Sequence, residues 1–232
     1  MAPEKIVCLK PLESGLIYHF LNSNNDLAYL LQAEIDIKEQ LLHRDFIDSW
    51  KIVADKKNIF KTYFKLENVI EGSFEIANRL FDLQFEEVFN IEKYHKDVKT
   101  YNVTDNNGNF VAVYYADFHP RKGKRNGAWM TSYKPQQIKN GVNERPHVSI
   151  VCNFTKPTET KPSLLTFNEV TTLFHEFGHA LHGMLANTTY NSLSGTSVSW
   201  DFVELPSQVM ENWCYEKEAL ELFAKHYETG EV

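Results

Sequence analysis

Apolar residues recur at helical spacing in three stretches of the chain. Over residues 26–46 and again over residues 73–89, apolar side chains return every three or four positions among charged ones, which predicts two amphipathic helices. The third stretch follows Thr166. There, Thr166-x-x-Glu169 has the spacing of a capping box, in which the hydroxyl and the carboxylate each satisfy a free backbone N–H. We therefore expect a helix that begins at Thr166, with Gly183 helping to end it.

Between the second and third helical stretches the pattern changes to that of β-strands. Residues 98–103 and 110–115 are runs of β-branched and aromatic side chains. The residues from Asp105 to Gly108 readily adopt the backbone conformations of a tight turn, so the pattern predicts a β-hairpin. Residues 148–154 form another short apolar run, typical of a buried strand. The expected fold class is α+β, mainly α with a small β-sheet.

The composition is that of a soluble globular protein. Of the 232 residues, 43% are hydrophobic and 24% charged, and no apolar run approaches the length that spans a membrane. The formal net charge of −7 argues against a binder of nucleic acid or of anionic membranes. We see no signal peptide, and the three widely spaced cysteines suggest neither a disulfide framework nor a metal knuckle. We expect a cytoplasmic protein whose partners include neither nucleic acid nor membrane.

One loop is locally basic. Residues 119–125 concentrate four basic side chains after a predicted strand. Such a loop is either solvated or in contact with a substrate carboxylate or a nucleic acid, and the negative net charge favours the solvated loop. Tyr94 and His95 are interpreted as structural residues, because no spacing links them to a site.

The third predicted helix carries a metal-binding motif. His175-Glu-Phe-Gly-His179 is an HExxH sequence. Residues four apart share one helix face about 6 Å apart, so both imidazoles can reach one metal ion at about 2 Å. Glu176 then lies beside the metal rather than on it, in the position of a general base. The alternative is a chance HExxH on an amphipathic helix, so a third ligand is needed.

Two residues compete for the third ligand position. His182 lies near the same face, but about 10.5 Å of helical rise separate it from His175, whereas zinc ligand atoms lie about 3–4 Å apart. Glu204 closes Asp201-Phe-Val-Glu204, whose capping-box spacing predicts the start of a second helix that tolerates Pro206 in its first turn. Glu204 either completes a His-His-Glu set, with the fourth position left for water, or only caps its helix.

These motifs together resemble a known family. The residues 175–182 (HEFGHALH), 194–196 (SGT), 201–208 (DFVELPSQ) and 211–213 (ENW) are similar to the catalytic core of the thimet oligopeptidase family of zinc peptidases, which includes oligopeptidase A, neurolysin and bacterial peptidyl-dipeptidase. Residues 63–67, 94–98, 117–121, 127–130 and 151–153 look like further landmarks of that family in the same order. The resemblance covers the chain from about Tyr63 onward. It implies a zincin-like catalytic core of a neurolysin-like helical peptidase.

The resemblance also implies roles for single residues. Carried over residue by residue, it makes His175, His179 and Glu204 the ligands of one Zn2+ per chain and Glu176 the catalytic base. The implied activity is hydrolysis of peptide bonds in short oligopeptides, by Glu-assisted attack of a zinc-bound water. The peptidyl-dipeptidase branch, which releases C-terminal dipeptides, looks nearest, and oligoendopeptidase action is the rival. Residues 194–196 are expected in a flexible loop that faces the substrate.

The length of the sequence leaves a second reading open. Residues 1–60 do not resemble the family and are expected to form an N-terminal helical segment, with residues 61–232 as a partial catalytic domain. The family's catalytic domain continues well beyond its HExxH helix, whereas this sequence stops at Val232, so the core is expected to be incomplete at its C-terminus. The alternative function is a truncated, catalytically inactive zinc-binding or interaction module. A helical scaffold without metal is a third reading.

Overall fold

The computed structural model describes residues 6–7, 20–21 and 60–232. The first two pieces are the strands β1 (Ile6–Val7) and β2 (Phe20–Leu21), which pair antiparallel. The helix expected over residues 26–46 and the segment expected over residues 1–60 lie outside the described residues, apart from these two short strands and Phe60.

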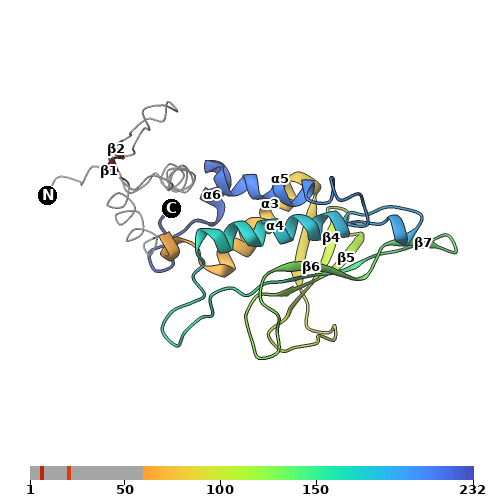
Figure 1. Ribbon diagram of the computed structural model, residues 1–232, viewed down its shortest axis with the longest axis horizontal. Helices are drawn as coiled ribbons and strands as arrows, with labels where there is room; N and C mark the ends of the chain where they lie inside the picture. Colours follow the sequence, from red (N-terminus) through yellow and green to blue (C-terminus); the bar gives the residue numbers. More distant parts are fainter. Residues whose placement is uncertain (1–5, 8–19, 22–59) are drawn as a thin grey trace.

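A five-stranded mixed sheet forms one layer of the structure (Figure 1). Its strands follow the order β3-β4-β5-β9-β6. β5 and β9 are parallel, and every other neighbouring pair in this sheet is antiparallel. A separate hairpin, β7–β8, extends from its end. The strands are β3 (Leu83–Glu87), β4 (Lys99–Asp105), β5 (Phe110–Asp117), β6 (Trp129–Lys134), β7 (Gln137–Lys139), β8 (Val142–Glu144) and β9 (His147–Val151).

The predicted hairpin is confirmed as β4–β5. Asp105 organises its turn by accepting backbone N–H groups of Asn107 and Asn109 on one carboxylate oxygen, at 2.9 and 2.8 Å. Gly108 has a φ of 79°, a left-handed conformation that glycine adopts without strain. The strand predicted over residues 148–154 is also confirmed, as β9, which ends at Val151.

The helix predicted over residues 73–89 is wrong in its second half. Helix α3 spans Leu66–Phe81 and ends at Asp82, which has a left-handed φ of 57°. The chain then enters β3. Phe85 fits the apolar helical spacing, but it lies on β3. From there its ring stacks on that of Phe74 in α3, with centroids 4.1 Å apart. The spacing was ambiguous because alternating apolar residues at 83 and 85 also suit a half-buried strand.

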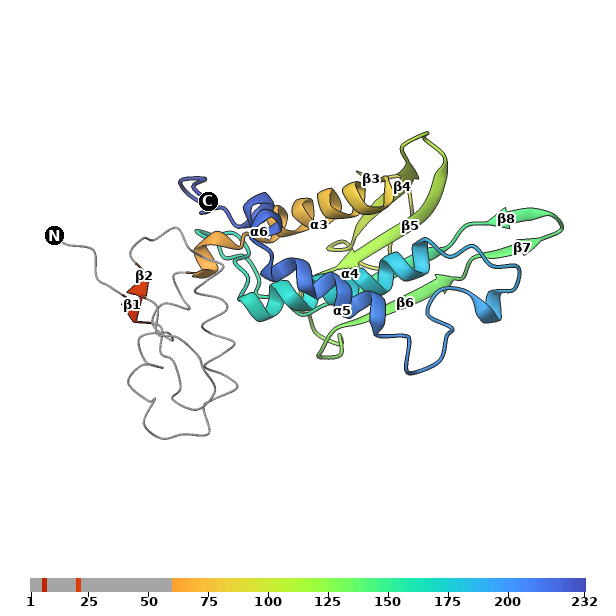
Figure 2. The same cartoon turned by 90° about the horizontal axis from the view of Figure 1, so that it is seen from above.

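The helices of the described region lie on one side of the five-stranded sheet, as Figures 1 and 2 show. Besides α3 they are α4 (Phe167–Met184), α5 (Leu205–Asn212) and α6 (Lys217–Phe223). Both α3 and α4 are in contact with the sheet. α4 packs on β5, β6 and β9, and α5 runs along α4. Short 3-10 turns occupy Lys61–Tyr63, Asn191–Leu193 and Trp213–Tyr215. This arrangement confirms the α+β class.

The core lies between the sheet and the helices. Tyr114 of β5 contacts Phe177 of α4 with ring centroids 5.8 Å apart, and both side chains are fully buried. On the opposite face of β5, Val113 and Tyr115 form a second cluster with Val98. β5 is thus buried on both faces, which holds α4 in a fixed orientation above it. Within the described residues, no helix is both long and apolar enough to cross a membrane.

Candidate metal centre

Helix α4 begins as its sequence predicts. The Thr166 hydroxyl accepts the backbone N–H of Glu169 at 3.2 Å, and the Glu169 carboxylate accepts the N–H of Thr166 at 2.8 Å. This is the complete capping box. The helix buries Phe174 and Phe177 toward the core. Because the apolar side of α4 is fixed in this way, the HExxH residues turn toward α5.

The C-terminal end of α4 is held by a residue that the sequence analysis missed. The Arg145 guanidinium donates to the carbonyl oxygens of Met184 and Ala186 at 2.7 and 2.9 Å, and also to that of Val111. It thereby satisfies carbonyls that a helix end leaves free. Gly183 does not end the helix. It lies inside the last turn, where an added Cβ would stand 2.7 Å from the Met130 side chain.

Glu204 does not act as part of a capping box. It occupies the position before α5, but its side chain makes no capping hydrogen bond. The preceding residues form turns closed on the Ser199 carbonyl, which accepts the N–H groups of Phe202 and Val203. The expected role of Asp201 and Glu204 as a reciprocal cap is therefore wrong, because the chain enters α5 from a turn. Pro206 lies in the first turn of α5, as expected.

Two glycines allow this segment to approach α4. An added Cβ at Gly178 would lie 2.6 Å from Cα of Ser207 and 2.7 Å from the Pro206 carbonyl oxygen. Gly195, with a φ of 56°, lies against Gly183, and its added Cβ would stand 3.0 Å from the Gly183 Cα. The 194–196 motif, expected as a flexible loop, is thus packed on α4, with Ser194 only 6% exposed.

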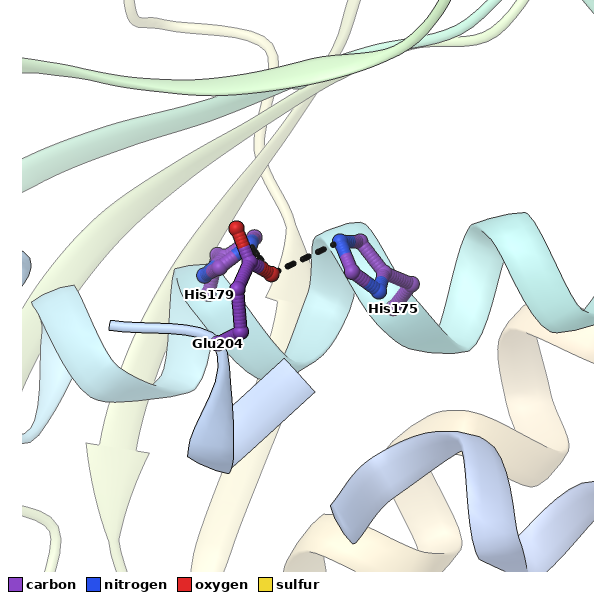
Figure 3. A group of neighbouring side chains, drawn as sticks. All are labelled: His175, His179 and Glu204. Carbon is purple, nitrogen blue, oxygen red and sulfur yellow. Dashed lines mark ion pairs between the residues drawn. The ribbon is translucent and has the colours of Figure 1, made fainter. Parts of the chain in front are cut away.

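The predicted ligand residues converge. Both Nε2 atoms approach one carboxylate oxygen of Glu204, at 3.3 Å from His175 and 3.1 Å from His179 (Figure 3). One ligand atom from each of the three residues lies within 4.8 Å of the others. Since zinc ligand atoms lie about 3–4 Å apart, a small closure around an ion gives the spacing of a zinc site. The chemistry of this donor set, two imidazoles and a carboxylate, also fits zinc.

His182 stands apart from this group. The three converging residues do not include it, and its ring lies beside Phe202 with centroids 6.1 Å apart. Together with Gly178, Leu205 and Pro206, His182 lines an apolar groove of about 520 Å³ between α4 and α5. The structure therefore brings Glu204, and not His182, to the histidine pair.

Glu176 lies beside the group and is buried, with 6% of its surface exposed. It lines a cavity of about 340 Å³ together with Ala128, Thr171, Thr172, His175 and Glu211. Burial raises the pKa of Glu176 to about 7; the Glu204 carboxylate also raises this pKa, and His175 lowers it. A carboxyl group with a pKa near 7 can both accept and return a proton at neutral pH.

Glu211 is the second site residue that the sequence analysis did not assign. Its carboxylate lies 2.5 Å from Nδ1 of His175. Ser207, one turn earlier on α5, donates its hydroxyl to the carboxylate and the main-chain oxygen of Glu204, at 2.9 and 2.8 Å. The signal was the helical spacing of Glu204, Ser207 and Glu211, which places all three on one face of α5.

The basic loop is neither free nor fully solvated. Arg121 donates from both of its terminal nitrogens to the Asp117 carboxylate, at 2.7 and 2.8 Å, and Lys124 donates to it at 2.8 Å. Tyr94 adds a fourth hydrogen bond. Burial alone would raise the pKa of Asp117, but these hydrogen bonds outweigh burial and hold its pKa below the usual value. Two of the four basic residues thus hold the loop together around a buried carboxylate.

Comparison with known proteins agrees with the motifs. Oligopeptidase A of Haemophilus influenzae is 44% identical over 173 residues, which cover 74% of this chain and 25% of that protein. Dipeptidyl carboxypeptidase of Escherichia coli is 44% identical over 171 residues, 73% of this chain and 25% of that protein. The enzyme of the same name from Salmonella typhimurium is 44% identical over 217 residues, 91% of this chain and 32% of that protein. The chain spans about a quarter to a third of the length of these relatives.

The family match is broader than the motifs quoted above. The sequence profile of peptidase family M3 matches residues 18–232, which include His175, Glu176, His179 and Glu204. The match begins well upstream of Tyr63, where the recognisable motifs start. Since it covers nearly the whole sequence, the chain belongs to peptidase family M3.

Proposed function

We propose that this chain contributes the metal-binding part of a zinc peptidase that hydrolyses peptide bonds in short oligopeptides. In this proposal His175, His179 and Glu204 hold one Zn2+, and residues 61–232 form part of a zincin-like catalytic domain. The observation that carries the proposal is the convergence of three ligand atoms within 4.8 Å beside a buried glutamate. Membership of family M3 agrees with it.

The side chains divide the chemistry between them. When bound, Zn2+ supplies Lewis acidity that polarises the scissile carbonyl. Glu176 accepts the proton of the attacking water and later returns it to the departing amine nitrogen, for which a pKa of about 7 is well matched. The 340 Å³ cavity beside Glu176 gives water and substrate access to its carboxylate.

The finer specificity is part of the same proposal. Some relatives are named dipeptidyl carboxypeptidase and others are named oligopeptidase A. We propose release of C-terminal dipeptides as the activity, with oligoendopeptidase action as the alternative. We also propose a cytoplasmic location, in line with a relative from Arabidopsis thaliana that is named probable cytosolic oligopeptidase A.

The test is Glu176→Gln, with the exposed Glu221→Gln of α6 as its matched control. Metal analysis should find about one zinc per chain in all three proteins. Hydrolysis of a short fluorogenic peptide should fall about 10²–10⁴-fold in Glu176→Gln only, since general base catalysis contributes that much. Mass spectrometry of the products separates dipeptide release from internal cleavage.

Three outcomes would overturn the proposal or part of it. If Glu176→Gln still hydrolyses the peptide, Glu176 is not the general base. Stoichiometric zinc without hydrolysis by the unmodified chain favours the zinc-binding module without peptidase activity. Absence of bound zinc at neutral pH favours a helical scaffold and contradicts the metal site itself.

A further inference from the structure

Helix α5 meets the first histidine of the motif twice. Glu204, immediately before the helix, approaches Nε2 of His175 at 3.3 Å. Glu211, two turns later, approaches Nδ1 of the same ring at 2.5 Å. The imidazole therefore lies between two carboxylates, one immediately before α5 and one in its last turn, that are seven positions apart in the sequence.

The second histidine has no such support. Nδ1 of His179 is buried, and it has no hydrogen-bond partner among the described residues. His179 is also the more buried of the two, with a side chain 11% exposed against 28% for His175. Packing can hold the His179 ring in place, whereas the His175 ring borders the cavity and needs a directional contact to fix it.

We propose that Glu211 is a positioning residue that sets the tautomer and the orientation of His175. An acceptor at Nδ1 keeps the proton on that nitrogen, so Nε2 presents its lone pair toward His179 and Glu204. This inference rests on the proposed zinc function. In it, the segment from Glu204 to the end of α5 provides one zinc ligand and orients another.

The competing explanation is that Glu211 only ties α5 to α4. Its side chain is 33% exposed and lies on the cavity wall, so removing it need not disturb the core. A structural tie would change the stability of the fold, whereas a positioning role changes the tautomer of one ring and the affinity for zinc. These readouts separate the two explanations.

The experiment compares the unmodified chain with Glu211→Ala, Glu211→Gln and the exposed control Glu218→Gln. Alanine removes both charge and acceptor, and glutamine removes the charge alone. In the metal-free proteins at pH 8, 15N NMR of the histidine rings should show His175 with its proton on Nδ1 in the unmodified chain. Glu211→Ala should shift it toward the Nε2–H form, which predominates in free histidine.

Zinc affinity is the second readout, measured by competition with a chromophoric chelator. We expect about a 10–100-fold weaker affinity for Glu211→Ala, as is typical when the partner of a ligating histidine is removed. Glu211→Gln should fall between Glu211→Ala and the unmodified chain, and Glu218→Gln should match the latter. The thermal midpoint of the metal-free variants should stay close to that of the control.

Three outcomes overturn the proposal or the function beneath it, and they are distinguishable. An unchanged His175 tautomer in Glu211→Ala contradicts the positioning role, whether or not zinc binds. A lower thermal midpoint together with unchanged zinc affinity indicates a structural tie. If the unmodified chain binds no zinc, the proposed function fails, while the tautomer measurement still decides the role of Glu211.

Discussion

The two sides of the candidate metal centre are built in different ways. The histidines stand on an 18-residue helix that is capped at its start, held at its end by Arg145 and packed on the sheet. Glu204 stands at the end of a series of turns, with a side chain 51% exposed. Local sequence signals predict the helix of the first side and the spacing of its two histidines. The second side depends on one tertiary contact, between the start of α5 and α4.

This difference shows where the centre is vulnerable. The distance between the two histidines is set by helix geometry, and changes elsewhere in the chain hardly alter it. The distance from either histidine to Glu204 is set by the contact of Gly178 with Pro206 and Ser207. Changes at that contact should therefore affect zinc affinity more than changes along the rest of α4.

Gly178→Ala is expected to have the largest effect. The new Cβ would stand 2.6 Å from backbone Cα of Ser207 and 2.7 Å from a backbone oxygen, so α5 must shift to admit it. Helix propensity alone would make alanine more stable than glycine here by about 1 kcal/mol. A loss of stability would therefore indicate the clash with α5. We expect the free energy of unfolding, measured in urea, to be lower than that of the unmodified chain by roughly 1–3 kcal/mol. We also expect zinc affinity to fall more than about tenfold.

Gly72→Ala is the matched control for this substitution. An added Cβ there meets the side chain of Phe223 at 2.6 Å, in the contact between α3 and α6. Gly72→Ala should also destabilise the chain, because the added methyl group overpacks this contact. It should leave the zinc dissociation constant unchanged. Equal zinc affinities in the two variants would contradict the dependence of Glu204 on the α4–α5 contact.

The same contrast explains what could be predicted from the sequence. The helix from Thr166 and the β4–β5 hairpin are specified by short-range signals, a capping box and a turn, and both are observed. The end of α3 was missed because Phe85 fits two periodicities. The sequence of residues 66–89 does not show that Phe85 of β3 stacks on Phe74 of α3, because that contact forms only in the folded core.

Within the site, the same limit applies to the residues that act across elements. HExxH spacing is sufficient to pair His175 with His179. The role of Arg145 at the end of α4 could not be predicted, because 39 positions separate it from the Met184 carbonyl that it binds. Glu211 was detectable only as a residue on the same helix face as Glu204, and its contact with His175 depends on how α5 crosses α4.

Ser207→Ala removes only the hydrogen bonds that orient Glu204, so we expect a smaller effect than that of Gly178→Ala. Ser207 is fully buried, and its hydroxyl is shared between two oxygens of Glu204. Without it, the exposed carboxylate gains rotational freedom, and we expect about a tenfold weaker zinc affinity, at the low end of such effects. Ser73→Ala is the control, because its buried hydroxyl donates to the Ile70 carbonyl in α3. Zinc affinity that stays unchanged in Ser207→Ala would show that the turns before α5 suffice to orient Glu204.

Thr166→Ala should have the smallest effect on the centre and an effect of about 1 kcal/mol on stability. It removes the hydroxyl half of the capping box, nine positions before His175. The first turn of α4 should loosen, but Phe174 and Phe177 remain fully buried and keep the helix in its orientation. Urea unfolding should therefore reveal the loss, while chelator competition gives an unchanged zinc affinity. If zinc affinity falls in parallel with stability, the histidine side depends on its cap as much as the glutamate side depends on α5, and the contrast between the two sides fails.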